Sequence, residues 1–423
     1  MSQQQKAPDQ PGPAVPVPAD LADERLIQDA GLGGALRAFG QRIRGGELGS
    51  LPVVIGLVVI SIVFYVQEPI FLSSRTLVGI TLFAAPVGII ALGVVLVLLL
   101  GEIDLSVGSV SGLCAAVLAW VIVYQGQSLV LGLLAGAVTG AAIGVLYGLL
   151  YTKVGVPSFV ITLAGLLGFL GLQLWVLGKN GTVNLPPSSG LIEFARRSFV
   201  DGVAAYVLVV VAVAAYAAAE LFSMRRRRAA GLSAPAPVVL GVKVALMLAG
   251  GLFLAYYLGI DRGFGYLPLF FVALVVLFDI VLRRTTWGRH VFAVGGNEEA
   301  ARRSGINVDF IYISVFTLTG LLSAVGGILA AAQLTSVSQA SGGTDTNLTA
   351  IAAAVIGGTS LFGGRGSAWA ALLGIIVLQS IQAGLNVVGV DSSVRYMVTG
   401  AVLLLAVSID SVSRRARSSS GRG

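Results

Sequence analysis

Charged residues are scarce in this sequence of 423 residues: Asp, Glu, Lys and Arg together make up only 11% of it. A soluble domain carries about 25% charged residues, so the chain lacks the polar surface that such a domain needs. Hydrophobic residues reach 56%, and the mean hydropathy is +0.92. The shortage of charge therefore excludes an ordinary water-soluble protein.

Cysteine and histidine occur once each, as Cys114 in an apolar run and His290 in a polar stretch. A single cysteine excludes an internal disulfide and a multi-cysteine metal site. A single histidine leaves too few parts for a histidine-based metal site or a Ser-His-Asp triad. The G-x-x-x-x-G-K-[ST] motif of ATP-binding Walker loops is also missing. We therefore expect no catalytic residues, no metal, no cofactor and no ATPase site in the chain itself.

What the sequence does contain is long apolar runs, such as Ala84–Leu100, along nearly its whole length. Runs of about 18 or more residues are typical of helices that cross a bilayer, and they do not alternate as barrel strands do. We predict an all-α, polytopic integral membrane protein with about 12 transmembrane segments. They are expected at 51–66, 78–100, 107–124, 129–150, 158–177, 203–222, 238–258, 266–282, 310–332, 348–362, 367–388 and 395–411.

The basic residues test this arrangement, because Lys and Arg concentrate in cytoplasmic segments. An even number of spans puts both termini on one side, and the segments of that side carry 20 of the 27 basic residues. The other side carries six, and Lys243 lies within a span. We therefore predict a multi-pass membrane protein with both termini cytoplasmic. The cytoplasmic segments are 1–50, 151–157, 223–237, 283–309, 363–366 and 412–423.

Three of these segments are expected to lie outside the membrane domain 51–411 or to divide it. Residues 1–50 form a Pro- and Gln-rich, then basic, region that we expect to be disordered in its first part. Residues 412–423 form a basic tail, and residues 223–237 form a linker that contains Arg225–Arg228. These four arginines could be mistaken for a nucleic-acid patch, but they fit the basic flank of a span, so no nucleic acid partner is expected.

The longest polar insertion, 283–309, carries five arginines and the only histidine. Asn297 has helix-capping chemistry, and the two acids that follow it suit the positive end of a helix. Arg302 and Arg303 come in the last turn, and Gly305 is placed to end it. The insertion therefore predicts a short capped helix at the membrane surface, suited to being gripped by another protein.

A second polar segment, Gly101–Ser109 (GEIDLSVGS), interrupts the apolar sequence with two acids. Acids at membrane depth are costly and face a cavity, a partner or water. One interpretation is a broken helix in which Asp104 and Ser106 cap the next helix beside a translocation pathway. The other is an ordinary cytoplasmic turn, which we favour for Glu102 and leave open for Asp104.

Two further segments have possible roles. Lys153–Thr162 (KVGVPSFVIT) is either a simple helix entrance at Pro157 or part of the pathway. Leu334–Gly366 joins a polar, glycine-rich approach, a short apolar piece and a second glycine-rich turn. It predicts a re-entrant or broken helix, which is tolerated in a membrane only against protein or water. Asn347 and Thr349 would then face a passing polar solute.

These motifs resemble the permease subunits of bacterial ATP-binding-cassette (ABC) sugar importers of the ribose/xylose type, a group related to branched-chain amino acid permeases. The matching pieces are GEIDLSVGSV, VPSFVITLAG, TWGRHVFAVGGNEEAARRSGI and LTAIAAAVIGGTSLFGGRGS, at 101–110, 156–165, 286–306 and 348–367. The length of the chain is more similar to the xylose-type members. Glu102 departs from the pattern, since the family usually has glycine there.

The resemblance implies a homodimer, or a pair with a homologue, bound to cytosolic ABC ATPase subunits. An extracytoplasmic sugar-binding protein would deliver the solute, and membrane lipid would surround the spans. It also implies that part of the polar insertion docks on the ATPase: Gly288, Arg289, Ala293, Gly295, Gly296, Asn297, Glu298, Ala300, Ala301 and Gly305.

The reading that follows is a transport subunit that moves a monosaccharide, xylose or a similar pentose, with energy from a separate ATPase. The spans hold almost no acids or histidines that could relay protons, which disfavours the ion-coupled secondary transporter. That transporter, an ABC permease for a non-sugar solute and a membrane-embedded enzyme are the alternatives.

Overall fold

The computed structural model describes residues 51–179, 181–232 and 236–391, residue 234 and a few later positions (393–395, 397, 398, 400, 401, 404 and 408). The predicted N-terminal region 1–50 and the basic tail 412–423 lie outside the described residues. Most of the predicted span 395–411 does so as well.

Helices carry most of the described chain, and two π-helical turns, Trp120–Tyr124 and Leu150–Val154, extend α4 and α5. The long helices are α2 (Leu51–Gln67), α3 (Ser74–Leu99), α4 (Val107–Ala119), α5 (Leu129–Leu149), α6 (Ser158–Leu177), α8 (Gly202–Ala229), α9 (Pro237–Gly259), α10 (Tyr266–Arg284), α13 (Val308–Leu334) and α15 (Trp369–Val387). The shorter ones are α7 (Gly190–Ile192), α11 (Thr286–Gly296), α12 (Glu298–Arg303) and α14 (Thr344–Ile356).

Nine of the helices in the described part of the chain are long and apolar enough to cross a membrane. α2 is equally apolar but has 17 residues. The prediction of an all-α, polytopic membrane protein is confirmed. The nine helices are α3, α4 and α5 with their π-helical extensions, α6, α8, α9, α10, α13 and α15.

Two predicted boundaries differ from the structure. The segment expected at 348–362 is the helix α14, which already ends at Ile356, because Gly357 follows and Gly358 has a φ of +102°. The helix expected at 203–222 continues as α8 to Ala229, so Arg225–Arg228 of the predicted linker are helical. Arginine is a good helix former, and the first break is Gly231, with a φ of +68°.

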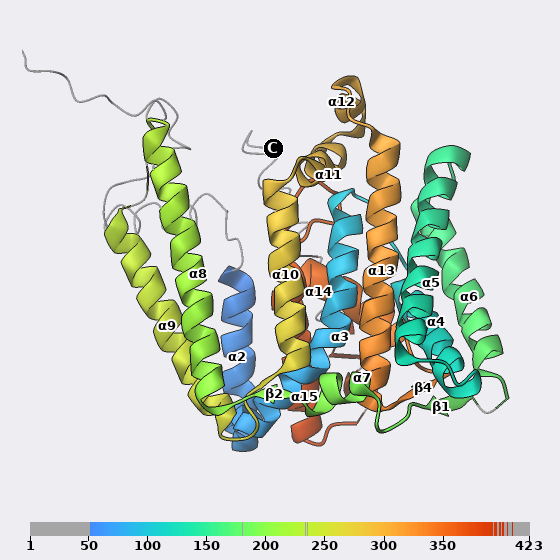
Figure 1. The fold of residues 1–423 in the computed structure, drawn as a ribbon, viewed down its shortest axis with the longest axis horizontal. Coiled ribbons are helices and arrows are strands. Elements are labelled where there is room, and N and C mark those ends of the chain that lie inside the picture. The colour runs from blue at the N-terminus through green and yellow to red at the C-terminus, as the bar shows by residue number, and fades with distance from the viewer. Residues whose placement is uncertain are drawn as a thin grey trace, which may run out of the picture. The chain divides into compact units, whose positions relative to one another are not determined.

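The chain divides into two compact units, and within the described residues the smaller one is Tyr206–Leu254, most of α8 and α9. The two helices run antiparallel (Figure 1). They pack through small residues, since a Cβ added to Gly251 would lie 2.6 Å from the Val209 side chain. Large apolar side chains such as Leu246 and Phe253 are exposed, as expected of a surface that faces lipid.

The larger unit contains the remaining helices and is built around α3, which is buried on every side from Gly88 to Leu99. A helix that is apolar all round belongs in a core. α10, α13, α14 and α15 all pack against it. The polar segment 101–106 therefore follows directly on the most buried part of the unit.

α5 and α13 approach each other through a row of glycines on α5, spaced four residues apart. A Cβ added to Gly140 or Gly144 would collide with the backbone of α13 at Gly320 and Phe316. Small residues let membrane helices approach closely, so that van der Waals contacts hold them together where lipid is as apolar as the side chains. The buried glycines that face α13 are Gly136, Gly140, Gly144 and Gly148, whereas Gly132 faces Leu118 and Ile122.

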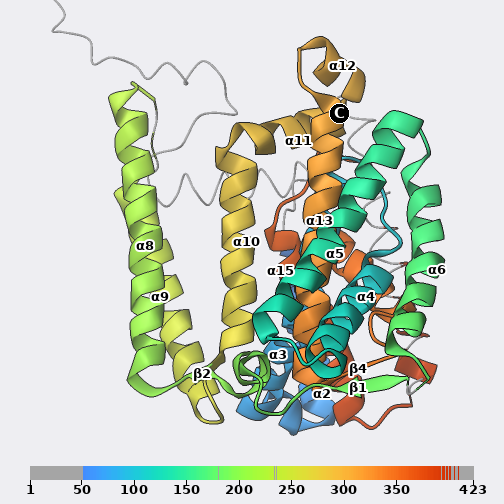
Figure 2. The ribbon, with the colours of Figure 1, turned by 45° about the vertical axis from the view of Figure 1, so that its right-hand side comes forward.

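Two short antiparallel sheets lie at one end of the larger unit, and α11 and α12 lie at the other (Figure 1, Figure 2). β1 (Thr182–Asn184) pairs with β4 (Ser336–Ser338), with Val183 opposite Val337. β2 (Phe199–Val200) pairs with β3 (Phe264–Gly265). The long helices therefore connect a strand-bearing end to an end that carries the polar insertion.

Candidate functional site

The short helix predicted in the polar insertion is present as α12, with the predicted cap. Asn297 Oδ1 accepts a hydrogen bond of 2.8 Å from the Ala300 N–H. Gly305, with a φ of +85°, follows the helix in the left-handed region that glycine favours. The capping residues thus fix both ends of a helix that has only six residues.

Two ion pairs run along α12, each spanning one turn. Glu298 contacts Arg302 at 2.8 Å, and Glu299 contacts Arg303 at 3.0 Å. The hydrogen bond with Glu298 raises the pKa of the Arg302 guanidinium, which therefore stays charged. Exposed pairs add little stability, so their main effect is to fix where the charges point.

A second helix, α11, precedes α12 and was not predicted. Thr285 Oγ1 caps it by accepting a hydrogen bond of 3.1 Å from the Gly288 N–H. Its buried face consists of Gly288, Val291 and Val294, spaced three residues apart. That spacing behind a capping threonine is the sequence signal that could have revealed α11.

The residues assigned to ATPase docking by resemblance divide into a buried and an exposed set. Gly288 and Ala301 are buried, and Gly295 and Glu298 are half-buried. The exposed residues form the outer surface of α11 and α12, which we call the α11–α12 surface: Arg289, Ala293, Gly296, Asn297, Ala300 and Gly305.

The end of α11 contacts the end of α3 and the turn after α14 through backbone atoms. A Cβ added to Gly295 would collide with the Leu99 carbonyl oxygen and lie 2.9 Å from the Gly364 nitrogen. The Gly364 N–H donates a hydrogen bond of 2.9 Å to that same carbonyl. No side chain intervenes between α11 and these backbone groups of α3 and of the turn after α14.

The loop between α3 and α4 is ordered by Asp104 and Ser106. Asp104 Oδ1 accepts hydrogen bonds from the Ser106 N–H and the Ser106 hydroxyl, both at 2.7 Å. The Tyr147 hydroxyl of α5 donates to Ser106 Oγ at 2.8 Å. Burial raises the pKa of the Asp104 carboxyl, although the two hydrogen bonds from Ser106 oppose the shift. The Asp104 side chain thus binds Ser106, the residue that precedes α4, and does not cap the first turn of α4 as predicted.

Asn347 joins the start of α14 to the start of α4. Its side-chain amide donates to the Leu105 carbonyl, and its Oδ1 accepts a hydrogen bond of 3.4 Å from the Gly108 N–H. Asn347 is 2% exposed, whereas Thr349 is half-buried. The structure therefore brings three of the four predicted pathway residues, Asp104, Ser106 and Asn347, to the start of α4.

Gln173 of α6 is a further polar residue of this region that the sequence reasoning missed. It is fully buried, and its amide donates to the Ser338 and Ser341 carbonyls at 3.0 and 2.9 Å. A Cβ added to Gly112 of α4 would collide with its Oε1. Gln173 thus ties the segment between β4 and α14 to α6, and its polar character within an apolar span was the available signal.

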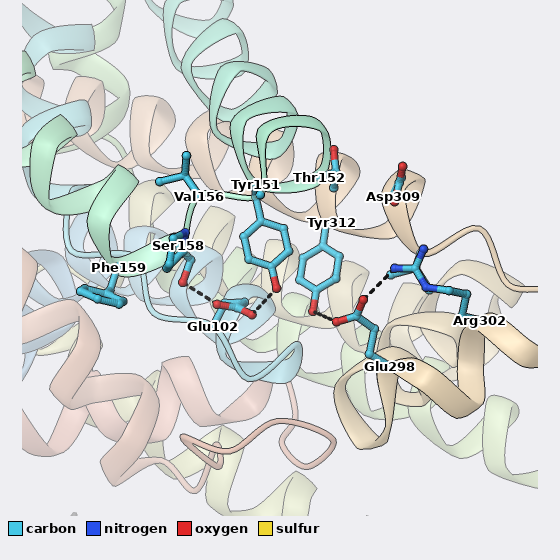
Figure 3. A pocket seen from close by; sticks show the side chains of 13 residues that line it. Glu102, Tyr151, Thr152, Val156, Ser158, Phe159, Glu298, Arg302, Asp309 and Tyr312 are labelled. Atoms are coloured by element: carbon cyan, nitrogen blue, oxygen red, sulfur yellow. Dashed lines mark hydrogen bonds and ion pairs between the residues drawn. The ribbon is translucent and has the colours of Figure 1, made fainter.

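A pocket of about 450 Å³ lies where α12, the start of α13, the end of α5 and the start of α6 meet (Figure 3). Pro157 and Ser158 line it at the start of α6, where the predicted helix start is found. Glu102 also lies here and is not left in an ordinary solvated turn, because its carboxylate accepts hydrogen bonds from Tyr151 and Ser158. The polar lining includes Glu102, Tyr151, Ser158, Glu298, Arg302 and Tyr312.

Among the described residues, no group of three or more His, Cys, Asp or Glu side chains is placed to hold a metal ion. The charged groups nearest the pocket pair with each other, as Lys153 does with Asp309 at 2.6 Å.

Comparison with known proteins agrees with this geometry. The chain is 34% identical to the xylose transport system permease protein XylH of Escherichia coli over 370 residues, which cover 86% of this chain and 92% of that protein. It is 33% identical to XylH of Haemophilus influenzae, with 86% and 98% covered. Identity to the ribose import permease protein RbsC of Bacillus subtilis is 33% over 365 residues, with 86% and 94% covered.

No solved structure matched the chain. A family model described as "Branched-chain amino acid transport system / permease component" matches residues 76–407, which include α3, the α11–α12 surface and α14. The chain belongs to this family of transport-system permease components.

Proposed function

We propose that this protein is the membrane-spanning permease subunit of an ABC importer, which carries a monosaccharide into the cell. The family and the similarity to xylose and ribose permeases support a pentose, xylose or one close to it, as the cargo. The observation that carries the proposal is the α11–α12 surface, which lies at one end of the apolar helices, on a helix whose residue Gly295 contacts the core through backbone atoms.

In this proposal a cytosolic ABC ATPase docks on the α11–α12 surface. When the ATPase closes on ATP, it moves α11 and α12, and the contact of Gly295 with Leu99 and Gly364 transmits the movement to α3 and to the turn after α14. The helices then exchange an outward-facing for an inward-facing arrangement. This assigns the docking role to the exposed residues and a packing role to Gly288, Gly295 and Ala301.

The proposal also places the protein in the bacterial plasma membrane with its termini and the α11–α12 surface in the cytoplasm. The excess of arginine and lysine in those segments supports this orientation. The strand-bearing end would then receive the extracytoplasmic binding protein. A second copy of the chain would complete the translocation pathway, and lipid would cover the exposed apolar helices.

For the pathway we propose that Asp104, Ser106 and Asn347 hold the starts of α4 and α14 in place, and that Thr349 contacts the solute. The hydrogen-bond partners of the first three support the positioning role. The half-buried Thr349 hydroxyl supports the second. A pathway with few charges suits a neutral sugar, which exchanges weak hydrogen bonds and is released readily.

The experiment is uptake of radiolabelled xylose into proteoliposomes that contain the purified chain, with or without its ATPase subunit and binding protein. We expect uptake with ATP and the ATPase subunit, no uptake with ADP, and no effect of a protonophore. Uptake without the ATPase subunit that a protonophore abolishes would instead indicate an ion-coupled secondary transporter. Calorimetry of the binding protein with pentoses, nucleosides and amino acids decides between a sugar and another cargo.

A further inference from the structure

We propose that Glu102 is a positioning residue that links α12 to the loop before α4 and to the start of α6. The proposal rests on the proposed function, because α12 is there the helix that the ATPase moves. It adds a second route, separate from the Gly295 contact, by which that movement reaches the segment that contains Asp104.

Glu102 itself joins two elements to the loop after α3. Its Oε1 accepts a hydrogen bond of 2.7 Å from the Tyr151 hydroxyl, at the end of α5, and its Oε2 accepts one from the Ser158 hydroxyl, at the start of α6. Asp104, only two residues further on, orders the residue before α4. In the proposal, a shift of the Glu102 carboxylate is passed along these two residues of backbone to the start of α4.

The second half of the link begins at α12. Glu298 accepts hydrogen bonds from Arg302 through Oε1, at 2.8 Å, and from the Tyr312 hydroxyl of α13 through Oε2, at 3.3 Å. Tyr312 lies near the start of α13, beside α12. A rotation of α12 thus changes the position of the Tyr312 ring.

The two halves meet at the tyrosines, as Figure 3 shows. The ring centroids of Tyr151 and Tyr312 are 4.4 Å apart, with an angle of 37° between the planes. Such a pair of packed rings is worth about 0.5–1.5 kcal/mol, and the proposal is that a shift of Tyr312 is passed to Tyr151 through this contact. The contacts run without a gap from Glu298 through Tyr312 and Tyr151 to Glu102.

A chain of contacts becomes a coupling route only if its ends are shown to be energetically coupled, which a double-mutant cycle measures. The complete complex of permease, ATPase and binding protein in proteoliposomes gives the readout, sugar molecules transported per ATP hydrolysed. The variants are Glu102→Gln, Glu298→Gln and the double variant. The matched control is Glu299→Gln, which makes the same change one residue further along α12, in an ion pair outside the pocket.

We expect Glu102→Gln and Glu298→Gln each to lower the transport per ATP about threefold or more. The double variant should transport no less sugar per ATP than the more impaired of the two single variants. Glu299→Gln should leave the transport per ATP near that of the unchanged protein. When it is combined with Glu102→Gln, the fold-change should be the product of the two single fold-changes. Tyr151→Phe, which keeps the ring contact but removes the hydroxyl, should reproduce Glu102→Gln.

A merely structural role of Glu102 predicts something else: a lower melting temperature, with uptake and ATP hydrolysis falling together and their ratio unchanged. That result, or fully multiplicative effects of Glu102→Gln and Glu298→Gln, would overturn the proposal while the proposed function stands. Absence of ATP-dependent uptake in the unchanged complex would overturn both.

Discussion

Replacing Gly295 by alanine tests how the α11–α12 surface is joined to the membrane helices. The added methyl group would collide with the Leu99 carbonyl oxygen and lie 2.9 Å from the Gly364 nitrogen, at the hydrogen bond between these two groups. Both obstacles are backbone atoms, which cannot rotate away as a side chain can. The end of α11 must therefore move, or the hydrogen bond must break.

The size of the effect follows from these contacts. Overpacking of a filled site costs about 1–3 kcal/mol, and a lost hydrogen bond costs about 1 kcal/mol. A change of about 2 kcal/mol alters the balance between two conformations about thirtyfold. We expect Gly295→Ala to insert in the membrane but to lose most of its ATP-driven uptake, while the ATPase subunit still hydrolyses ATP.

Gly171→Ala is the matched control, because no atom lies within 4 Å of a Cβ added at this position of α6, which is outside the α11–α12 surface. Uptake and ATP hydrolysis should be measured for both variants in the same proteoliposomes, at equal amounts of inserted protein. Near-normal uptake is expected for Gly171→Ala. Equal behaviour of the two variants, whether both active or both inactive, would refute the assigned role of the Gly295 contact.

Other contacts lead to predictions that melting temperatures of the purified protein can check. Asn347→Ala removes both hydrogen bonds to the start of α4 and should destabilise the protein by about 1–3 kcal/mol; an unchanged melting temperature would contradict this. Gly144→Ala should be destabilising because its methyl group meets the backbone of α13, whereas Gly168→Ala, with open space around it, should be neutral. Asp104→Ala should lower the free energy of unfolding by about 1–3 kcal/mol. Asp104→Asn should lower it much less, because an amide oxygen can accept the same two hydrogen bonds. An equal loss in both Asp104 variants would show that the charge itself is needed.

Local features of the fold could be predicted because neighbouring residues determine them. The long apolar runs predict the membrane helices, and Asn297, with the acids that follow it, predicts α12. Pro157 predicts the start of α6. In each case the chemistry that fixes the element lies within a few residues of it.

The contacts that give the candidate site its form were not predictable in this way. Asn347 and Leu105 are 242 residues apart in the chain, and no periodicity pairs them. The contact between Gly295 and Leu99 depends on backbone positions that only the packed helices define. Glu102 seemed to belong to an ordinary turn because its partners, Tyr151 and Ser158, come from two other helices.

The central claim is that a cytosolic ATPase drives this protein through the α11–α12 surface, and Ala300 is an exposed position on which to test it. Ala300→Cys is introduced together with Cys114→Ala, which removes the only native cysteine. The measurement is cross-linking from this cysteine to the ATPase subunit in membranes, with labelling by an impermeant thiol reagent in intact cells. The account predicts a cross-link to the ATPase and no labelling from outside. Labelling in intact cells, without a cross-link, would contradict it.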